Sequence, residues 1–156
     1  MTSACTVRRA SAGDAAALLV LMRALARFEG YLEQFRVTET DLLERGLGRQ
    51  SRQEFTALVA DDGSGGLLGY AVVCSLPFTY DLSPNLLLKE LYVQDSRRGL
   101  GVGRALMAGV MHEGRARGCA RLKWDVLQGN TRAQAFYRSL GGAPDVRWEG
   151  WIRQLA

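Results

Sequence analysis

One stretch, residues 86–117, constrains the fold more than any other. An apolar run with strand character, Leu86–Val93, leads into a loop with glycines at alternate positions, and a helical pattern follows. Gly99, Gly101 and Gly103 leave the loop without side chains at every second position, so successive backbone N–H groups can converge on an anion at the positive end of the helix. The order of strand, glycine loop and helix therefore predicts a phosphate-binding site.

The spacing of these glycines excludes two common phosphate motifs. The loop lacks the Gly-Lys-Ser/Thr ending of a nucleoside triphosphate loop, and its glycines are not spaced as in the dinucleotide fingerprint. It does fit the pattern Arg/Gln-x-x-Gly-x-Gly, which Arg98, Gly101 and Gly103 fill, and Arg97 and Arg104 add positive charge beside it. Taken alone, a glycine-rich turn with a solvated basic flank is the alternative interpretation.

Length and composition indicate one ordinary globular domain, residues 1–156. Hydrophobic residues make up 47% of the chain and charged residues 23%, both average for a globular protein. No apolar run approaches about 18 residues, and no basic-then-apolar signal pattern opens the sequence. We therefore expect a cytoplasmic protein with no membrane contact.

Metal ions and nucleic acids are not indicated as ligands. Three separated cysteines and the single histidine, His112, give no metal-binding spacing and no disulfide framework, so we expect no metal. The net charge of +4 comes from arginines that are spread along the chain and not interleaved with aromatic residues. A small polyanionic ligand accounts for the local excess at the glycine loop, and we expect no nucleic-acid partner.

Hydrophobic periodicity predicts an α/β fold. Apolar residues three and four apart predict helices at Ala15–Phe28 and Val102–Arg117. The strands on either side of the second helix should lie parallel and adjacent, within a mixed sheet that has helices on both faces. Two further helices are expected, one that begins at Thr38 and is ended by Gly46 and Gly48, and one at Thr131–Leu140. The expected strands are Thr6–Ala10, Glu54–Ala60, Leu67–Leu76, Leu86–Val93, Arg121–Leu127 and Val146–Leu155.

The second half of the chain matches a known family pattern in its order. After the glycine loop come Trp124–Leu127, then Asn130, then Ala135–Gly141 with its Phe136-Tyr137 pair. These four elements resemble the GNAT superfamily of N-acetyltransferases, which bind acetyl-coenzyme A. The resemblance implies a mixed, mostly antiparallel central sheet that is splayed at its middle strands and flanked by helices on both faces.

The first half narrows the resemblance. Leu25–Glu29, Thr38–Leu43 and Phe78–Asp81 are similar to the diamine (spermidine/spermine-type) N-acetyltransferases. This implies acetyl-coenzyme A as donor, the primary amine of a small molecule as acceptor, direct attack in a ternary complex, and a homodimer.

One departure from the diamine group concerns the acceptor. Many members carry two adjacent acids in the central strand, where this chain has Lys89 and Glu90. A lysine facing the pocket would repel a polycation. An amine that also bears a carboxylate therefore competes with diamines and polyamines as the expected acceptor.

The resemblance also implies where the coenzyme binds. The pyrophosphate should lie on the backbone N–H groups of Leu100–Arg104 with Arg98 beside it, and the pantetheine arm along Leu91–Val93 like an added strand. Asn130 should hydrogen-bond the coenzyme. The expected coenzyme-binding residues are Leu91, Tyr92, Val93, Arg98, Gly99, Leu100, Gly101, Val102, Gly103, Arg104, Asn130 and Tyr137.

Glu90 and Tyr137 are the expected catalytic residues. An alkylammonium must lose a proton before it attacks a thioester, and Glu90 is the candidate base, directly or through water. Neighbours in a strand face opposite sides, so a strand carrying both Lys89 and Glu90 must open one side to water, a ligand or an opposite charge. The Tyr137 phenol keeps its proton at neutral pH and would stabilise or protonate the departing thiolate. An ion pair at Glu90 and core packing at Tyr137 are the structural alternatives.

Acceptor binding is assigned by resemblance and charge alone, to Glu29, Glu33, Tyr80, Asp81 and Glu90. Two other functions stay open. One is a coenzyme A-binding regulatory or interaction domain without turnover, and the other is an acetyltransferase that acts on protein lysine or aminoglycosides.

Overall fold

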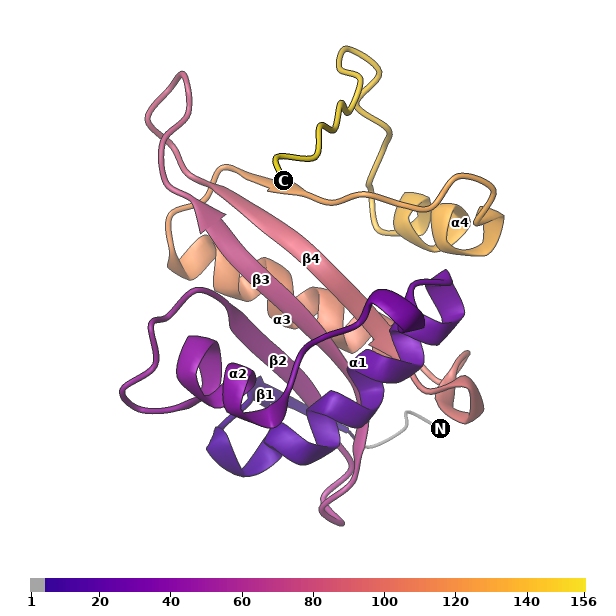
Figure 1. Cartoon of the computed structure of the whole chain (residues 1–156). Helices are drawn as coiled ribbons and strands as arrows, with labels where there is room; N and C mark the ends of the chain where they lie inside the picture. The colour runs from indigo at the N-terminus through magenta and orange to yellow at the C-terminus, as the bar shows by residue number, and fades with distance from the viewer. Residues whose placement is uncertain (1–4) are drawn as a thin grey trace. The chain divides into compact units, whose positions relative to one another are not determined.

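The computed structural model describes residues 5–156 and divides into two compact units (Figure 1). The first unit ends at Trp124, and the second is Asp125–Ala156. Each unit is described by itself below.

A five-stranded sheet forms the first unit, with the strands in sequence order. The first four strands are antiparallel, and the fifth runs parallel to the fourth, as the sequence predicts. The fourth and fifth strands pair only over Asn85–Leu87 and Arg121–Lys123, so the edge of the fourth strand from Leu88 onward lies beyond this pairing. The strands are β1 (Thr6–Arg9), β2 (Thr56–Asp61), β3 (Leu67–Leu76), β4 (Asn85–Val93) and β5 (Arg121–Lys123).

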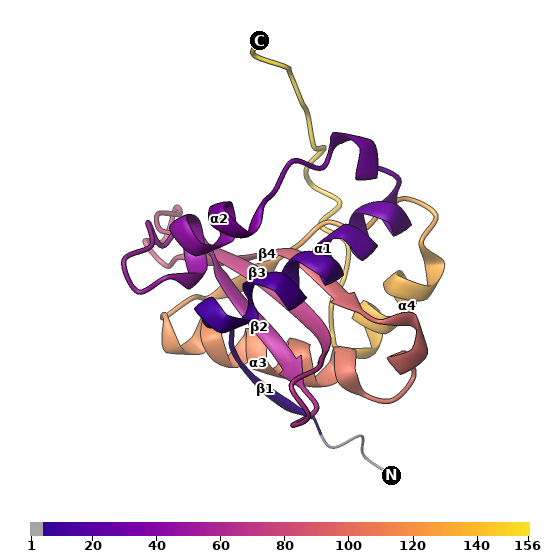
Figure 2. The ribbon, with the colours of Figure 1, turned by 60° about the horizontal axis from the view of Figure 1, so that its bottom comes forward.

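Helices cover both faces of this sheet (Figures 1 and 2). On one face lie α1 (Ala15–Glu29) and the short α2 (Glu39–Leu42), and on the other lies α3 (Val102–Ala116). The apolar side of α1 packs on the sheet in one buried cluster that includes Leu18 and Tyr70. The expected GNAT-type architecture, mixed and mostly antiparallel with helices on both faces, is confirmed.

Small residues allow α3 to approach the sheet closely. A Cβ atom at Gly109 would lie 2.7 Å from the Val7 side chain, and one at Gly114 would lie 3.3 Å from Leu86. Leu106 and Val110 of the same helix have no exposed surface. The α3 face of the sheet is therefore a second apolar layer, distinct from the layer under α1.

The second expected helix begins as predicted and ends at Gly48, one of the two glycines expected to end it. Thr38 and Asp41 form a capping box at its start. After α2 the chain continues as one turn of π-helix, Leu43–Leu47. Gly46 lies inside that turn, where a Cβ would come 2.3 Å from the Phe55 ring, so this glycine is needed for close packing and does not end the helix.

The second unit contains one helix, α4 (Thr131–Ser139), within its described residues. The predicted strand at Val146–Leu155 is wrong, because these residues form no strand, and the predicted strand from Arg121 stops at Lys123. Trp148, Trp151 and Ile152 are 71%, 90% and 88% exposed. Alternating apolar residues form a strand only where a partner strand completes the ladder, and the second unit offers none among its described residues.

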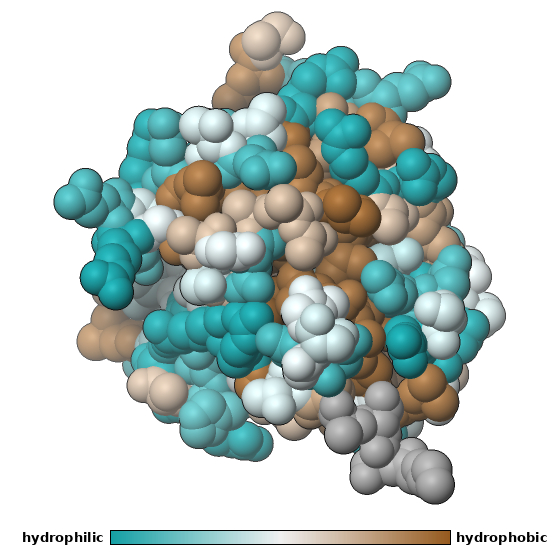
Figure 3. All heavy atoms as spheres, turned by 90° about the horizontal axis from the view of Figure 1, so that it is seen from below, coloured by the Kyte–Doolittle hydropathy of each residue, from teal (hydrophilic) through white to brown (hydrophobic). Residues whose placement is uncertain are grey.

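Hydrophilic and hydrophobic residues are mixed over the face seen from below (Figure 3). Across residues 5–156, every helix is too short or too polar to be a candidate membrane span.

Candidate active site

A bulge in β4 separates the two charged residues of the expected site. Val73 pairs with Leu88 and Val72 pairs with Glu90, which leaves Lys89 as an extra residue between them. One extra residue reverses the alternation of side chains, so Leu88 and Glu90 lie on opposite faces of the sheet. Lys89 is exposed, whereas Glu90 is half-buried on the α1 face.

Glu90 accepts a hydrogen bond from Tyr70, with 2.8 Å between the phenol oxygen and Oε2. Burial raises the pKa of Glu90 above its ordinary value, and the charge of Glu29 adds to this effect. The Tyr70 hydrogen bond and the Lys89 charge act in the opposite direction and lower the pKa. A carboxylate with a raised pKa is a stronger base, which suits removal of a proton from an ammonium group.

Two more side chains belong to the same environment. Burial raises the pKa of Glu29, the last residue of α1. Burial, followed by the charges of Glu90 and Glu29, raises the pKa of Tyr31 to about 12. We call Glu29, Tyr31, Tyr70 and Glu90 the Glu90 cluster: two carboxylates and two phenols that influence one another electrostatically.

Sequence reasoning missed Tyr70, one of the two phenols of the cluster. Tyr70 looks like an ordinary apolar residue within a strand, and only the register of β3 on β4 places it diagonally across from Glu90. Tyr31 follows the helix-ending Gly30, in the loop 29–37, whose acids and aromatic residues the sequence offers either as a surface for a cationic substrate or as capping and packing residues. No sequence signal short of the strand register would have found Tyr70.

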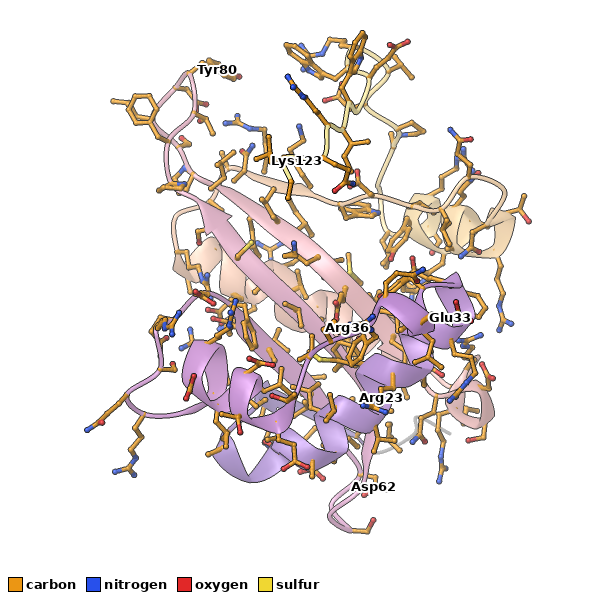
Figure 4. All side chains as sticks on the ribbon, in the orientation of Figure 1. Arg23, Glu33, Arg36, Asp62, Tyr80 and Lys123 are labelled. Carbon is orange, nitrogen blue, oxygen red and sulfur yellow. The ribbon has the colours of Figure 1, made fainter. Side chains whose placement is uncertain are left out.

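Three of the five expected acceptor-binding residues, Glu33, Tyr80 and Asp81, are not part of the Glu90 cluster. Glu33 and Tyr80 lie far apart in the first unit (Figure 4), and Tyr80 is 90% exposed. Asp81 forms an ion pair with Arg121 of β5 at 3.0 Å, and this contact holds the pKa of Asp81 well below its ordinary value. Its charge therefore serves to fix the β3–β4 connection.

The glycine loop has the backbone that the sequence predicts. Gly99 and Gly101 have φ angles of 77° and 85°, in the left-handed region that favours glycine, and Gly101 is the N-cap of α3. A Cβ at either position would meet no atom within 4 Å, so the space in front of the loop is open. The first N–H groups of an α-helix lack partners within the helix, so the loop and α3 offer donors to an anion.

Arg98 of the motif holds the loop to the rest of the unit. Its Nε donates to the Val93 carbonyl at 3.1 Å, and its Nη1 pairs with Asp95 at 2.9 Å. The guanidinium lies 5.1 Å from the centre of the Phe28 ring and 5.5 Å from that of Tyr92. This arginine thus connects the end of β4, the glycine loop and the end of α1.

The outer edge of β4 is suited to an extended ligand. A Cβ at Gly69 would lie 2.5 Å from the Tyr92 carbonyl oxygen, which shows that this carbonyl faces β3. Backbone polar groups alternate along a strand, so those of Leu91 and Val93 face the opposite edge. That edge lies beyond the short pairing with β5. The backbone at Leu91 and Val93 thus fits the expected pantetheine site, with the Val93 carbonyl already bonded to Arg98.

Within the second unit, Asn130 is the N-cap of α4 and Tyr137 lies in this helix. The Asn130 side chain caps the helix by accepting the Ala133 N–H at 3.1 Å. The rings of Phe136 and Tyr137 lie 5.3 Å apart and are tilted. Asn130 therefore has a structural role in starting this helix in addition to its expected contact with the coenzyme.

Several known proteins are similar to this chain in sequence. A family model described as the acetyltransferase (GNAT) family matches residues 20–142. Thialysine N-epsilon-acetyltransferase of Bos taurus is 30% identical over 151 residues, covering 93% of this chain and 88% of that protein. Spermidine/spermine N(1)-acetyltransferase-like protein 1 of Homo sapiens is 30% identical over 153 residues, covering 93% of this chain and 21% of that protein.

The fold agrees with these sequence matches. An integron cassette protein of V. cholerae superposes with a TM-score of 0.79 at 23% identity, covering 99% of this chain and 93% of that one. The family model spans most of the chain, and the first relative matches nearly all of it, so the resemblance seen in the sequence is confirmed. The chain belongs to the acetyltransferase (GNAT) family and is an acetyl-coenzyme A-dependent N-acetyltransferase.

Proposed function

We propose that this enzyme acetylates the primary amine of a small molecule that also carries a carboxylate, by direct attack of the amine in a ternary complex. The observation that carries the proposal is the pairing of the Glu90 cluster with the exposed Lys89 at its border. Carboxylates attract the ammonium group of the acceptor, and a lysine attracts a carboxylate and repels further amines.

The relatives are consistent with this choice. One is named for thialysine, a lysine analogue that has both an amine and a carboxylate, and another for spermidine and spermine, which are polycations without a carboxylate. Lys89 favours the first kind of acceptor, because its charge contributes to the electrostatics at Glu90. Polyamines are the second candidate.

The donor site is assigned to residues that fit the coenzyme. The glycine loop with the start of α3 would hold the pyrophosphate, and the outer edge of β4 at Leu91 would receive the pantetheine arm. When bound, acetyl-coenzyme A supplies the acyl group as an activated thioester. The open space before Gly99 and Gly101 supports this assignment.

Two residues of the chain would move protons in the reaction. Glu90 would accept the proton of the acceptor ammonium, directly or through one water, and Tyr137 would donate its phenol proton to the departing sulfur. Glu90→Gln should abolish the acid limb of the rate profile set by this carboxyl. Tyr137→Phe should lower kcat by about tenfold to a thousandfold while coenzyme A binding is retained. Full turnover in either variant would remove that residue from the mechanism.

The proposal also covers the domain organisation, the oligomeric state and the location of the enzyme. The two units would work as one acetyltransferase domain over 1–156, which the family match across both units supports. The enzyme would act as a homodimer, and the exposed apolar side chains of the second unit offer a surface for it. A cytoplasmic location and the absence of metal, membrane and nucleic-acid partners stay predictions.

The decisive experiment measures release of coenzyme A from acetyl-coenzyme A against a panel of acceptors. The panel contains thialysine, other amino acids, diamines, spermidine and spermine, and aminoglycosides. We expect the highest kcat/KM with an amine that bears a carboxylate. A preference for spermidine over thialysine would overturn the acceptor assignment, and tight coenzyme binding without turnover of any amine would favour the non-catalytic alternative.

A further inference from the structure

We infer that Tyr70 is a positioning residue that holds the Glu90 carboxylate ready to accept the proton of the acceptor amine. The inference rests on the proposed role of Glu90 as the base. It adds a side chain from the neighbouring strand that would not touch the substrate and would act through Glu90.

The contact depends on the bulge at Lys89. In the register of β3 on β4, Tyr70 pairs with Tyr92 and Val72 pairs with Glu90, so Tyr70 and Glu90 are diagonal neighbours. Long side chains at diagonal positions of a strand pair can reach one another. If Leu88, Lys89 and Glu90 alternated as in a regular strand, Glu90 would share the face of Leu88 and point away from the Tyr70 hydroxyl.

Tyr70 is held rigidly enough to orient a partner. The residue is 0% exposed and belongs to the apolar cluster under α1. Its ring centre lies 6.4 Å from that of Tyr92. The one polar atom of this buried side chain donates to Glu90 Oε2 at 2.8 Å, so the hydrogen bond fixes one carboxylate oxygen to the sheet.

The environment of Glu90 shifts its pKa in both directions, and the Tyr70 hydrogen bond is one of these effects. The groups that shift the pKa of Glu90 are Tyr70 of β3, Lys89 of β4 and Glu29 at the end of α1, and the charge of Glu90 in turn raises the pKa of Tyr31 just after α1. Burial and Glu29 favour the protonated carboxyl, whereas Tyr70 and Lys89 favour the carboxylate. Burial and the Glu90 charge raise the pKa of Tyr70, so the phenol keeps its proton and remains a donor at neutral pH.

Tyr70→Phe tests the inference, because it removes one oxygen and keeps the buried ring. We expect the acid limb of kcat/KM against pH to move upward by roughly one pH unit, since a hydrogen bond to the charged form is lost. Ser75→Ala is the matched control. It removes a hydroxyl from the same strand, β3, where the hydroxyl accepts from Arg117 at 3.0 Å, while Glu90 keeps its donor, so the acid limb should stay at its wild-type position.

A second measurement separates Tyr70 from the role of Glu90 in catalysis. The side-chain carboxyl of Glu90 is followed by carbon-13 NMR during a pH titration, with Glu90→Gln to assign the signal. We expect its pKa to rise in Tyr70→Phe by about the same one unit as the acid limb. The titration does not depend on activity, and it also shows that the variant is folded.

The outcomes are distinguishable. A carboxyl pKa that is the same in wild type and Tyr70→Phe would overturn the inference. A carboxyl pKa that rises while the rate profile stays unchanged would support the contact between Tyr70 and Glu90, and would overturn the base role assigned to Glu90 under the proposed function. A rise in both supports the inference together with the base role.

Discussion

At the scale of single residues, the proposed acceptor preference depends on Lys89. Because it is the extra residue of the bulge, it is exposed while its neighbour Glu90 is turned toward the α1 face. The charge of Lys89 still lowers the pKa of Glu90. An acceptor bound at Glu90, as proposed, would therefore meet negative charge at the cluster and positive charge at its border.

Lys89→Glu should change the preference of the enzyme among amines. Attraction for a substrate carboxylate becomes repulsion, and a second amine is no longer repelled. We expect the ratio of kcat/KM for thialysine to that for spermidine to fall about tenfold, since each exposed charge pair contributes up to about 1 kcal/mol. Kinetics with both acceptors at low salt measures the ratio.

Arg115→Glu is the matched control for this charge change. Arg115 is an exposed residue of α3, on the opposite face of the sheet, and its replacement alters the net charge by the same amount. The control should leave the ratio near the wild-type value. An equal fall in both variants would mean that overall charge, not Lys89, sets the preference.

At the scale of elements, an ion network ties the start of α1 to the edge of the sheet. Arg8 of β1 donates to both carboxylate oxygens of Asp14, at 2.8 and 3.0 Å, and to Asp61 of β2. Asp14 in turn accepts the Ser11 N–H just before the helix. This network fixes the direction in which α1 leaves β1 and crosses the sheet toward the Glu90 cluster.

Asp14 should make the stability of the protein depend on acid pH. Its hydrogen bond with Arg8 lowers the pKa of Asp14 from 3.8 to about 2. Because the folded-state pKa lies below the unfolded one, this contribution is complete above about pH 4 and is lost as the pH falls to about 2. A shift of this size corresponds to roughly 2 kcal/mol of unfolding free energy.

Denaturant unfolding of Asp14→Asn at several pH values checks this. The variant should be less stable than wild type by roughly 2 kcal/mol at pH 7, and the difference should shrink toward zero near pH 2. Glu44→Gln removes an exposed carboxylate from the π-helical turn and should show no such pH-dependent difference. A stability gap for Asp14→Asn that is constant with pH would assign the effect to packing and not to the ion pair.

At the scale of the whole molecule, the C-terminal segment exposes large apolar side chains that association with another chain would bury. Val146, Trp148, Trp151, Ile152 and Leu155 are all exposed in the second unit. Large apolar side chains grouped in one segment often mark a surface that another chain covers. In the proposed homodimer, this segment would be buried between the two copies.

Light scattering on the full chain should therefore give the mass of a dimer. Replacing Trp148 and Trp151 by serine should give a monomer, because their apolar area would no longer be buried on association. Phe78→Ser is the control, since Phe78 is an exposed apolar residue in the β3–β4 connection of the first unit. A wild-type monomer would refute the homodimer, and a dimer in the double variant would place its interface elsewhere.

Much of the fold and part of the site could be predicted from the sequence, because the signals are local. Apolar spacing defined α1 and α3, and strand character defined β3 and β4. Gly30, Gly99 and Gly101 adopt positive φ angles, which a glycine in a turn already suggests. The alternation of side chains along a strand drew attention to Glu90, whereas the expected catalytic role of Tyr137 depended on the family pattern.

The sequence by itself determined the order of strands and helices, the glycine loop and the family. Only the tertiary structure decided which side chains meet. The bulge at Lys89, the Tyr70–Glu90 hydrogen bond, the ion pair of Asp81 with Arg121 and the absence of a strand at Val146–Leu155 all depend on which residues of separate segments are neighbours. Strand register comes from pairing between segments far apart in the chain, and one residue of shift moves every following side chain to the other face.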